Sequence, residues 1–351
     1  MTLREEFEKR EDNFMSPYGC RSGNSLGRTR PEAACPIRTA FQLDKDRILF
    51  SNAFRRLKYK TQVFLNPSGD EYRTRLTHTL EVAQISRTIA RAMFLNEDLA
   101  EAIALGHDLG HTPFGHGGEM VLKEIFSKGF SHQAQGIRVI EVLENFGQGL
   151  NLTYEVRDGI LRHSKGYGKI MPDNPRELPA TSEGRVVRVA DIMAYLNHDL
   201  EDAIHSGVIT EKDIPDVCNR VLGTSSDERI TTMMTDLIST SRPNNGQLLF
   251  DMTDKVYGAM SVLRQFLYER VYRSPLVHNE FIKAKKIMSE LFVYLLENET
   301  LLDEELARMR LPALHTTGSS KERMVCDLLA CMTDRYALSL YANTFFPSQM
   351  R

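Results

Sequence analysis

Apolar residues recur at helical spacing along most of the chain. Between residues 77 and 95 the apolar positions are Leu80, Val82, Ile85, Ile89 and Met93, which fall on one broad helical face. Similar patterns cover 41–57, 96–110, 121–126, 134–146, 154–164 and 184–204, and they continue through residues 210–351. Alternation of the kind that marks strands is rare. The pattern therefore predicts an all-α fold, with helices packed around a shared core.

Two segments lack this periodicity. Residues 1–37 are rich in Ser, Gly, Pro and Arg, which predicts an irregular N-terminal arm. Residues 61–72 (TQVFLNPSGDEY) combine a short apolar run with a turn, which is typical of either a small hairpin or an extended loop. We divide the chain into the arm (1–37), a helical core (38–205) and a C-terminal helical region packed on the core (206–351).

The composition limits the class of protein. Hydrophobic residues make up 42% and charged residues 26% of the 351 positions, as in a folded globular protein rather than a disordered one. No stretch approaches the ~18 uncharged apolar residues of a membrane span, and the first twelve residues, MTLREEFEKRED, lack the apolar segment of a signal peptide. The five cysteines are irregularly spaced, which favours reduced thiols over a disulfide framework. We expect a cytoplasmic protein that does not contact a membrane.

A group of histidines and aspartates predicts a metal site. His107 and Asp108 end an apolar helical segment, where such side chains must be paired or bound to metal. His78 lies in the preceding predicted helix. Asp191 lies inside a later apolar helix, where an unpaired carboxylate would cost roughly several kcal/mol. Two imidazoles and two carboxylates from three helices form an open-sided set of ligands suited to Zn, Fe, Mn, Ni or Mg.

The loop that follows carries further candidate chemistry. A His-Asp pair alone is common on surfaces, but HDLGHTPFGHGGE is so rich in His and Gly that it suits a ligand site better than a core. His116 and Glu119 share a helix face if a helix begins near His116, and a histidine oriented by a carboxylate is an acid–base arrangement. Alternatively, Glu119 stabilises the start of that helix. His132 is a third imidazole, to which the pattern gives no role.

The predicted helix at 184–204 also carries a polar stripe. Asp191, Tyr195 and Asp199 follow one another at intervals of four residues, so they lie on one slowly drifting face. If Asp191 binds metal, Tyr195 and Asp199 face the same cavity and offer hydrogen bonds to a sugar. The alternative is a polar helix edge that faces solvent.

Positive charge is concentrated just before the first metal histidine. Residues 38–75 contain nine basic and four acidic side chains, a net charge of +5, whereas the whole chain has −3 and the remainder therefore −8. The overall balance argues against a protein that coats nucleic acid non-specifically. Arg75 precedes His78 by one helical turn, and its guanidinium suits a phosphate held at the metal. A divalent metal beside such a side chain points to phosphoryl chemistry.

Longer strings identify a family. The chain resembles the HD-domain superfamily, and within it the bacterial dGTP triphosphohydrolase-like family, through RTRLTHTLEVAQ, HDLGHTPFGHGGE and GRVVRVADIMAYLNHDLEDAI. The resemblance runs from about residue 38 to about residue 203 and resumes at RMVCDLLACMTDRYALSLY near the C-terminus. It implies an HD-domain helical bundle.

The resemblance also implies roles for individual residues. One divalent metal ion per chain (Mn, Mg, Co, Ni, Fe or Zn) would be held by His78, His107, Asp108 and Asp191. Catalysis would use His116, Glu119 and His132. Glu119 would orient His116, and His132 would lie near the phosphates. The substrate would be held by Arg75 at the α-phosphate, Gln62 near the deoxyribose 3′-hydroxyl, and Tyr195 and Asp199 at the sugar.

The reaction implied by the resemblance is attack of water at the α-phosphorus of a deoxynucleoside triphosphate (dNTP). The products are the deoxynucleoside and inorganic triphosphate. Members of the family form homo-oligomers, here expected as a tetramer or hexamer, and often respond to a nucleotide activator.

Two alternatives stay open. An HD phosphodiesterase or nucleotidase would hold a second metal with His111, His116 and His132. A nucleotide sensor or a single-stranded nucleic-acid-binding protein on the same fold would use the +5 segment to follow a phosphate backbone.

Overall fold

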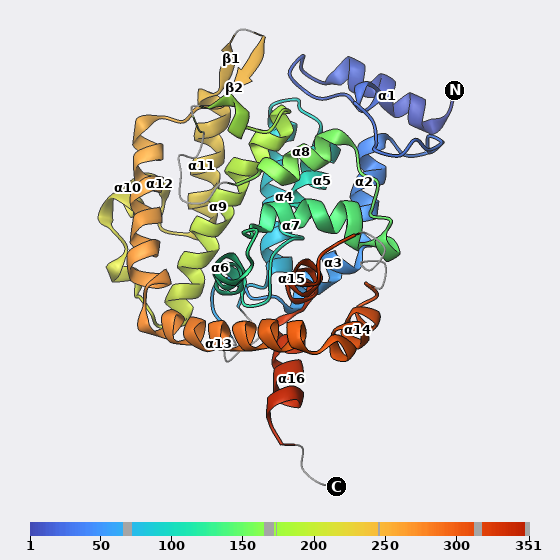
Figure 1. Ribbon diagram of the computed structural model, residues 1–351. Helices are drawn as coiled ribbons and strands as arrows, with labels where there is room; N and C mark the ends of the chain where they lie inside the picture. Colours follow the sequence, from blue (N-terminus) through green and yellow to red (C-terminus); the bar gives the residue numbers. More distant parts are fainter. Residues whose placement is uncertain (66–71, 165–171, 173, 245, 312–317, 348–351) are drawn as a thin grey trace. The chain divides into compact units, whose positions relative to one another are not determined.

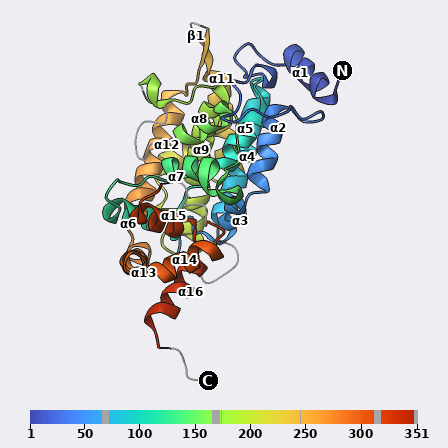
Figure 2. The ribbon, with the colours of Figure 1, turned by 45° about the vertical axis from the view of Figure 1, so that its right-hand side comes forward.

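The prediction of an all-α fold is confirmed. The computed structural model describes residues 1–65, 72–164, 172, 174–244, 246–311 and 318–347, and most of these are helical (Figure 1). The only named strands in these ranges are β1 (Arg242–Asn244) and β2 (Gln247–Leu249), an antiparallel hairpin that follows α11 (Ser226–Thr240) (Figure 2). The sequence pattern did not predict this short hairpin. None of the described helices is both long enough and apolar enough to cross a membrane.

The chain forms two compact units, of which the first comprises residues 1–49, 78–107 and 152–275. Its central helix is α9 (Ser182–His205), which is buried along most of its length because it packs against α5 (Glu97–Gly106), α8 (Tyr154–Arg162), α11 and α12 (Asp254–Leu267) (Figure 1). The unit also contains α1 (Leu3–Phe14), α2 (Ala40–Leu49), most of α4 (Arg75–Ala92) and α10 (Asp216–Leu222).

Glycine allows α5 and α8 to approach closely. A Cβ atom on Gly159 of α8 would lie 2.6 Å from Cδ1 of Ile103 on α5. A Cβ atom on Gly106, at the end of α5, would lie 2.5 Å from Cδ1 of Ile160. Both distances are shorter than carbon atoms tolerate. The two glycines therefore allow the end of α5 to pack closely against α8. His107 directly follows this end of α5.

The second unit comprises residues 50–77, 108–151 and 276–351. Its most buried helix is α15 (Lys321–Cys331), in which every residue from Met324 to Cys331 is buried. The others are α3 (Asn52–Arg56), α6 (Gly115–Ile125), α7 (His132–Arg138), α13 (Pro275–Glu297), α14 (Glu299–Arg308), which packs against α15, and α16 (Asp334–Phe345). A π-helical turn, Val139–Leu143, continues α7.

The expectation of an irregular segment over residues 1–37 is wrong at its start, where residues 3–14 form α1. The Thr2 hydroxyl accepts a hydrogen bond from the Glu5 N–H (3.3 Å), and the Glu5 carboxylate accepts one from the Thr2 N–H (2.8 Å). This capping box stabilises a helix that has no buried residue and hence no clear apolar pattern. The boundaries at residues 37 and 205 stay predictions.

The segment 61–72 lies partly outside the described residues. Within them, Thr61 and Thr74 form an isolated antiparallel bridge. The choice between a hairpin and an extended loop therefore stays open.

Candidate active site

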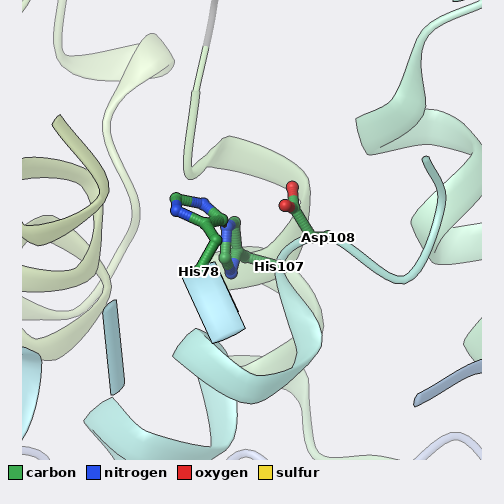
Figure 3. A group of neighbouring side chains, drawn as sticks. All are labelled: His78, His107 and Asp108. Atoms are coloured by element: carbon green, nitrogen blue, oxygen red, sulfur yellow. The ribbon is translucent and has the colours of Figure 1, made fainter. Parts of the chain in front are cut away.

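Three predicted metal ligands meet in the first unit. His78 lies on α4, His107 follows α5, and Asp191 lies on α9. The two Nε2 atoms are 3.3 Å apart, and Oδ1 of Asp191 lies 3.2 Å from Nε2 of His78 and 4.0 Å from Nε2 of His107. The fourth, Asp108, follows His107 directly, and His78, His107 and Asp108 each offer a ligand atom within 4.8 Å of the others (Figure 3).

Hydrogen bonds orient the two imidazoles. Nδ1 of His107 lies 2.6 Å from the Ala104 carbonyl oxygen, so Nδ1 carries the proton and the lone pair of Nε2 faces the cluster. Nδ1 of His78 lies 2.8 Å from Nε2 of His198, whose Nδ1 lies 2.7 Å from Oδ1 of Asp199. Such chains from a carboxylate through histidine fix the tautomer of metal-binding histidines.

The cluster fits a divalent metal ion. Ligand atoms at about 2.1 Å from a common ion lie about 3.0–3.4 Å apart when their angle at the ion is near 90–109°, and the His78–His107 and His78–Asp191 separations fall in that range. Burial raises the pKa of Asp191, but the hydrogen bond with His78 and the charge of His107 lower it more, so the pKa lies below the usual range. The carboxylate is therefore ionised, as a metal ligand must be.

Sequence reasoning gave no role to two buried histidines of this cluster. His163 packs its ring edge against His107, with ring centroids 5.1 Å apart, and its Nδ1 lies 2.7 Å from the Ile160 carbonyl oxygen. Nothing in its sequence context marks it. His198 carries a signal that we did not use, because His198 and Asp199 form a second His-Asp pair.

In the second unit, Arg75 and His111 both contact the Asp108 carboxylate. Nη1 of Arg75 donates to Oδ2 of Asp108 (2.8 Å), and its Nε donates to the Thr61 carbonyl (3.2 Å). Nε2 of His111 lies 3.2 Å from Oδ1 of Asp108. Burial lowers the pKa of His111 well below its usual value, and the charge of Arg75 lowers it further. Arg75 and His111 are both buried, so these charges act with little screening by water.

The predicted catalytic trio is brought together, with Glu119 at its centre. Nδ1 of His132 lies 2.9 and 3.0 Å from the two carboxylate oxygens of Glu119, which also accepts the His132 backbone N–H (2.9 Å). His116 lies farther away, with Nδ1 at 3.7 Å from Oε2 of Glu119 and 71% of its side chain exposed. Helix α6 begins at Gly115, so His116 and Glu119 share a face as expected. The alternative in which the charge of Glu119 stabilises the start of α6 stays open, because Glu119 lies near that end of the helix.

The electrostatics of Glu119 follow from this arrangement. Burial raises the pKa of Glu119, but the charge of His132, the contact with His116 and the hydrogen bonds with His132 lower it more, to below the usual range. Glu119 is therefore an anion that holds an imidazole on either side. The ring of His132 also stacks on that of His111, with centroids 4.0 Å apart and an interplanar angle of 17°.

Gln62 and its neighbour Lys60 are also buried in the second unit. Oε1 of Gln62 has no hydrogen-bond partner among the described residues, so this buried acceptor is open to a ligand. Lys60, which sequence reasoning missed, donates from Nζ to the carbonyl oxygens of His111 and, at 2.9 Å, Ala330. Burial lowers the pKa of Lys60 to about 7. Its place in a basic run, FRRLKYK, gave no sign of burial.

The polar stripe on α9 is not a solvent-facing edge. Asp199 is buried and Tyr195 is half-buried. The Tyr272 hydroxyl donates to Oδ2 of Asp199 (2.5 Å), while Oδ1 faces His198. Burial and the charge of Asp199 raise the pKa of Tyr272 well above its usual value. Tyr272 was not predicted, because nothing in its sequence context, LYERVYRS, marks it.

Comparison with known proteins agrees with this geometry. Residues 75–196 match the HD-domain family model, and this range contains all four predicted metal ligands and Arg75. The chain belongs to the deoxyguanosinetriphosphate triphosphohydrolase-like family of HD-domain proteins. The family resemblance stated from the sequence is confirmed. Residues 250–343 of this family member match the phosphohydrolase-associated domain.

The relatives are similar along the whole chain. A deoxyguanosinetriphosphate triphosphohydrolase-like protein of Desulfatibacillum aliphaticivorans is 59% identical over 350 residues, covering 100% of both chains. A protein of the same name from Caldanaerobacter subterraneus subsp. tengcongensis is 50% identical, covering 99% of this chain and 97% of its own. One from Clostridium tetani is 42% identical, with the same two coverages.

Proposed function

We propose that the protein hydrolyses deoxynucleoside triphosphates at the α-phosphate, giving a deoxynucleoside and inorganic triphosphate, with dGTP or another dNTP as substrate. The observation that carries the proposal is the cluster of His78, His107 and Asp191, joined by Asp108, which bears Arg75 on its carboxylate. The printed names of the relatives agree with it.

The cluster would hold one divalent ion through His78, His107, Asp108 and Asp191. Mn, Mg, Co, Ni, Fe and Zn all suit a set of two imidazoles and two carboxylates. When bound, such an ion polarises phosphoryl oxygens and acidifies water.

Other residues of the chain would bind the substrate. Arg75 would hold an α-phosphate oxygen, since a guanidinium anchored on Thr61 and Asp108 is already oriented. Gln62 would accept a hydrogen bond from the 3′-hydroxyl at its open Oε1. Tyr195 and Asp199 would line the sugar, where Tyr272 keeps Asp199 in place.

The histidines on either side of Glu119 would move the proton. Because Nδ1 of His132 faces the Glu119 carboxylate, Nε2 is the atom of His132 that exchanges a proton with the substrate. His116, being exposed, has access to a ligand as well. One of these imidazoles would protonate the 5′-oxygen of the deoxynucleoside as it departs from the α-phosphorus.

The test is a matrix of all four dNTPs with Mg, Mn or Co, with and without a second dNTP as activator. We expect inorganic triphosphate and deoxynucleoside in at least one combination, and loss of both products in His107→Ala. Pyrophosphate and deoxynucleoside monophosphate as the only products would refute cleavage of the bond between the α-phosphorus and the 5′-oxygen.

The second candidate is a two-metal phosphodiesterase or nucleotidase, because Asp108, His111 and His132 also offer ligand atoms within 4.8 Å of one another. The geometry favours the first candidate. The nearly parallel rings of His111 and His132 point their lone pairs along parallel planes, which do not converge on one ion. Elemental analysis distinguishes the candidates, since one ion per chain supports the first and two support the second.

The single-stranded nucleic-acid alternative has less support. Several positive charges of residues 38–75 do not form an open surface, because Lys60 and Arg75 are buried and Lys45 is paired with Asp98 and Glu101. Tight binding of a dNTP by the wild type with no turnover would support a sensor instead.

Assembly into a homo-oligomer, activation by a nucleotide and a cytoplasmic location complete the proposal.

A further inference from the structure

The C-terminal string RMVCDLLACMTDRYALSLY has no role in the proposed function, although it makes direct contact with segments that have one. Asp334 is the first residue of α16. Its Oδ1 accepts the Phe114 N–H (2.8 Å), and its Oδ2 accepts both the N–H (3.0 Å) and the hydroxyl of Thr61. One carboxylate therefore joins two segments that lie more than 200 residues before it.

Both segments lead directly to candidate active-site residues. Thr61 precedes Gln62, and Phe114 lies two residues before His116. Phe114 has φ +63°, a left-handed conformation that is unfavourable for a residue with a side chain and persists only where its surroundings hold it. The hydrogen bond to Asp334 is such a restraint.

The two segments also lie against each other. Gly115 has φ +58°, and a Cβ atom there would lie 3.0 Å from the Gln62 carbonyl oxygen and 3.1 Å from that of Thr61. A second tether runs parallel to the first, since Lys60 donates to the carbonyl oxygens of His111 and Ala330. The corner between α15 and α16 thus holds the loop 111–116 and the segment 60–62 at two points.

We propose that Asp334 is a positioning residue that sets the placement of Gln62 relative to His116. It acts through the backbone of Thr61 and Phe114, because each of its oxygens accepts from a different segment. This inference rests on the proposed function for the roles of Gln62 and His116, but the restraint itself is a property of the fold.

Asp334→Asn tests the proposal with little change in size. One oxygen becomes an NH₂ group that faces an N–H donor, so asparagine cannot satisfy both segments. Glu322→Gln is the matched control, because Glu322 also joins the C-terminal region to an earlier segment by accepting the Ser127 N–H (2.8 Å) and hydroxyl (2.7 Å), and Ser127 does not adjoin a candidate site residue in the sequence. We expect kcat/KM for the best dNTP to fall at least tenfold in Asp334→Asn and less than twofold in Glu322→Gln, with equal metal content.

A double-mutant cycle separates positioning from general damage. If Asp334 acts through Gln62, the effects of Asp334→Asn and Gln62→Ala on kcat/KM are less than multiplicative when combined, whereas those of Glu322→Gln and Gln62→Ala multiply. Multiplicative effects in both cycles would overturn the proposal. If Asp334→Asn does not fold, Thr61→Val, which removes one hydroxyl contact, replaces it with a smaller expected loss.

Amide hydrogen exchange distinguishes failure of this proposal from failure of the proposed function. In Asp334→Asn, peptides that span residues 58–64 and 112–118 should exchange faster than in the wild type, and in Glu322→Gln they should not. This result would support the restraint even if the wild type hydrolysed no dNTP. Unchanged exchange in both peptides would overturn the proposal whatever the activity.

Discussion

A buried carboxylate in the first unit makes stability depend on pH. Oε1 of Glu183 accepts the N–H groups of Cys20 and Asn96 (2.9 Å each), while its Oε2 has no hydrogen-bond partner among the described residues. Burial raises the pKa of Glu183 from 4.5 to about 6, despite these hydrogen bonds. Because the folded state disfavours the ionised form of Glu183, its protonated form stabilises the fold. This stabilisation is fully present below pH 4.5 and is lost as pH rises through about 6.

The magnitude follows from the two pKa values. The full loss is about 2 kcal/mol, and about 1.2 kcal/mol of it falls between pH 5 and pH 8. Glu183→Gln removes the titration but keeps Oε1 as the acceptor for Cys20 and Asn96. Its free energy of unfolding should therefore fall about 1.2 kcal/mol less than that of the wild type over this interval.

Urea unfolding of both proteins at pH 5 and pH 8, followed by circular dichroism, measures this difference. Each protein's change in unfolding free energy between the two pH values is determined first. Subtracting the change of the variant from that of the wild type cancels the titrating groups that the two proteins share. Equal pH dependence in the two proteins would show that Glu183 is not desolvated as the structure indicates.

Two further changes address the candidate active site. His198→Ala should weaken divalent metal binding about 10- to 100-fold, because it removes the partner of Nδ1 on His78. Titration of the metal-free protein with Co²⁺ measures this affinity, and an unchanged affinity would contradict the orienting role of His198. Glu119→Gln keeps an acceptor for the His132 N–H but removes the charge, so kcat should fall about 10- to 100-fold with little change in KM. Steady-state kinetics test this, and a changed KM alone would point to binding instead.

Local sequence predicted most of the helices and the candidate metal ligands. Periodicity is a property of neighbouring residues, so the buried faces of α5 and α9 were predictable, as was the place of His107 at the end of an apolar helix. Asp191 stood out because a carboxylate within an apolar helix needs a partner. Helix α1 was missed, although its capping box of Thr2 and Glu5 is equally local, because it buries no residue.

Only the tertiary structure decided which side chains serve each carboxylate. Glu119 contacts His132 more closely than the neighbouring His116, Asp199 is held by Tyr272, and Asp334 reaches back to Phe114. Hydrogen bonds depend on distances of about 3 Å between atoms, and sequence spacing sets such distances within one helix but not between segments far apart in the chain. The candidate site residues were therefore visible in the sequence, whereas the partners that orient them came from the packing of distant segments.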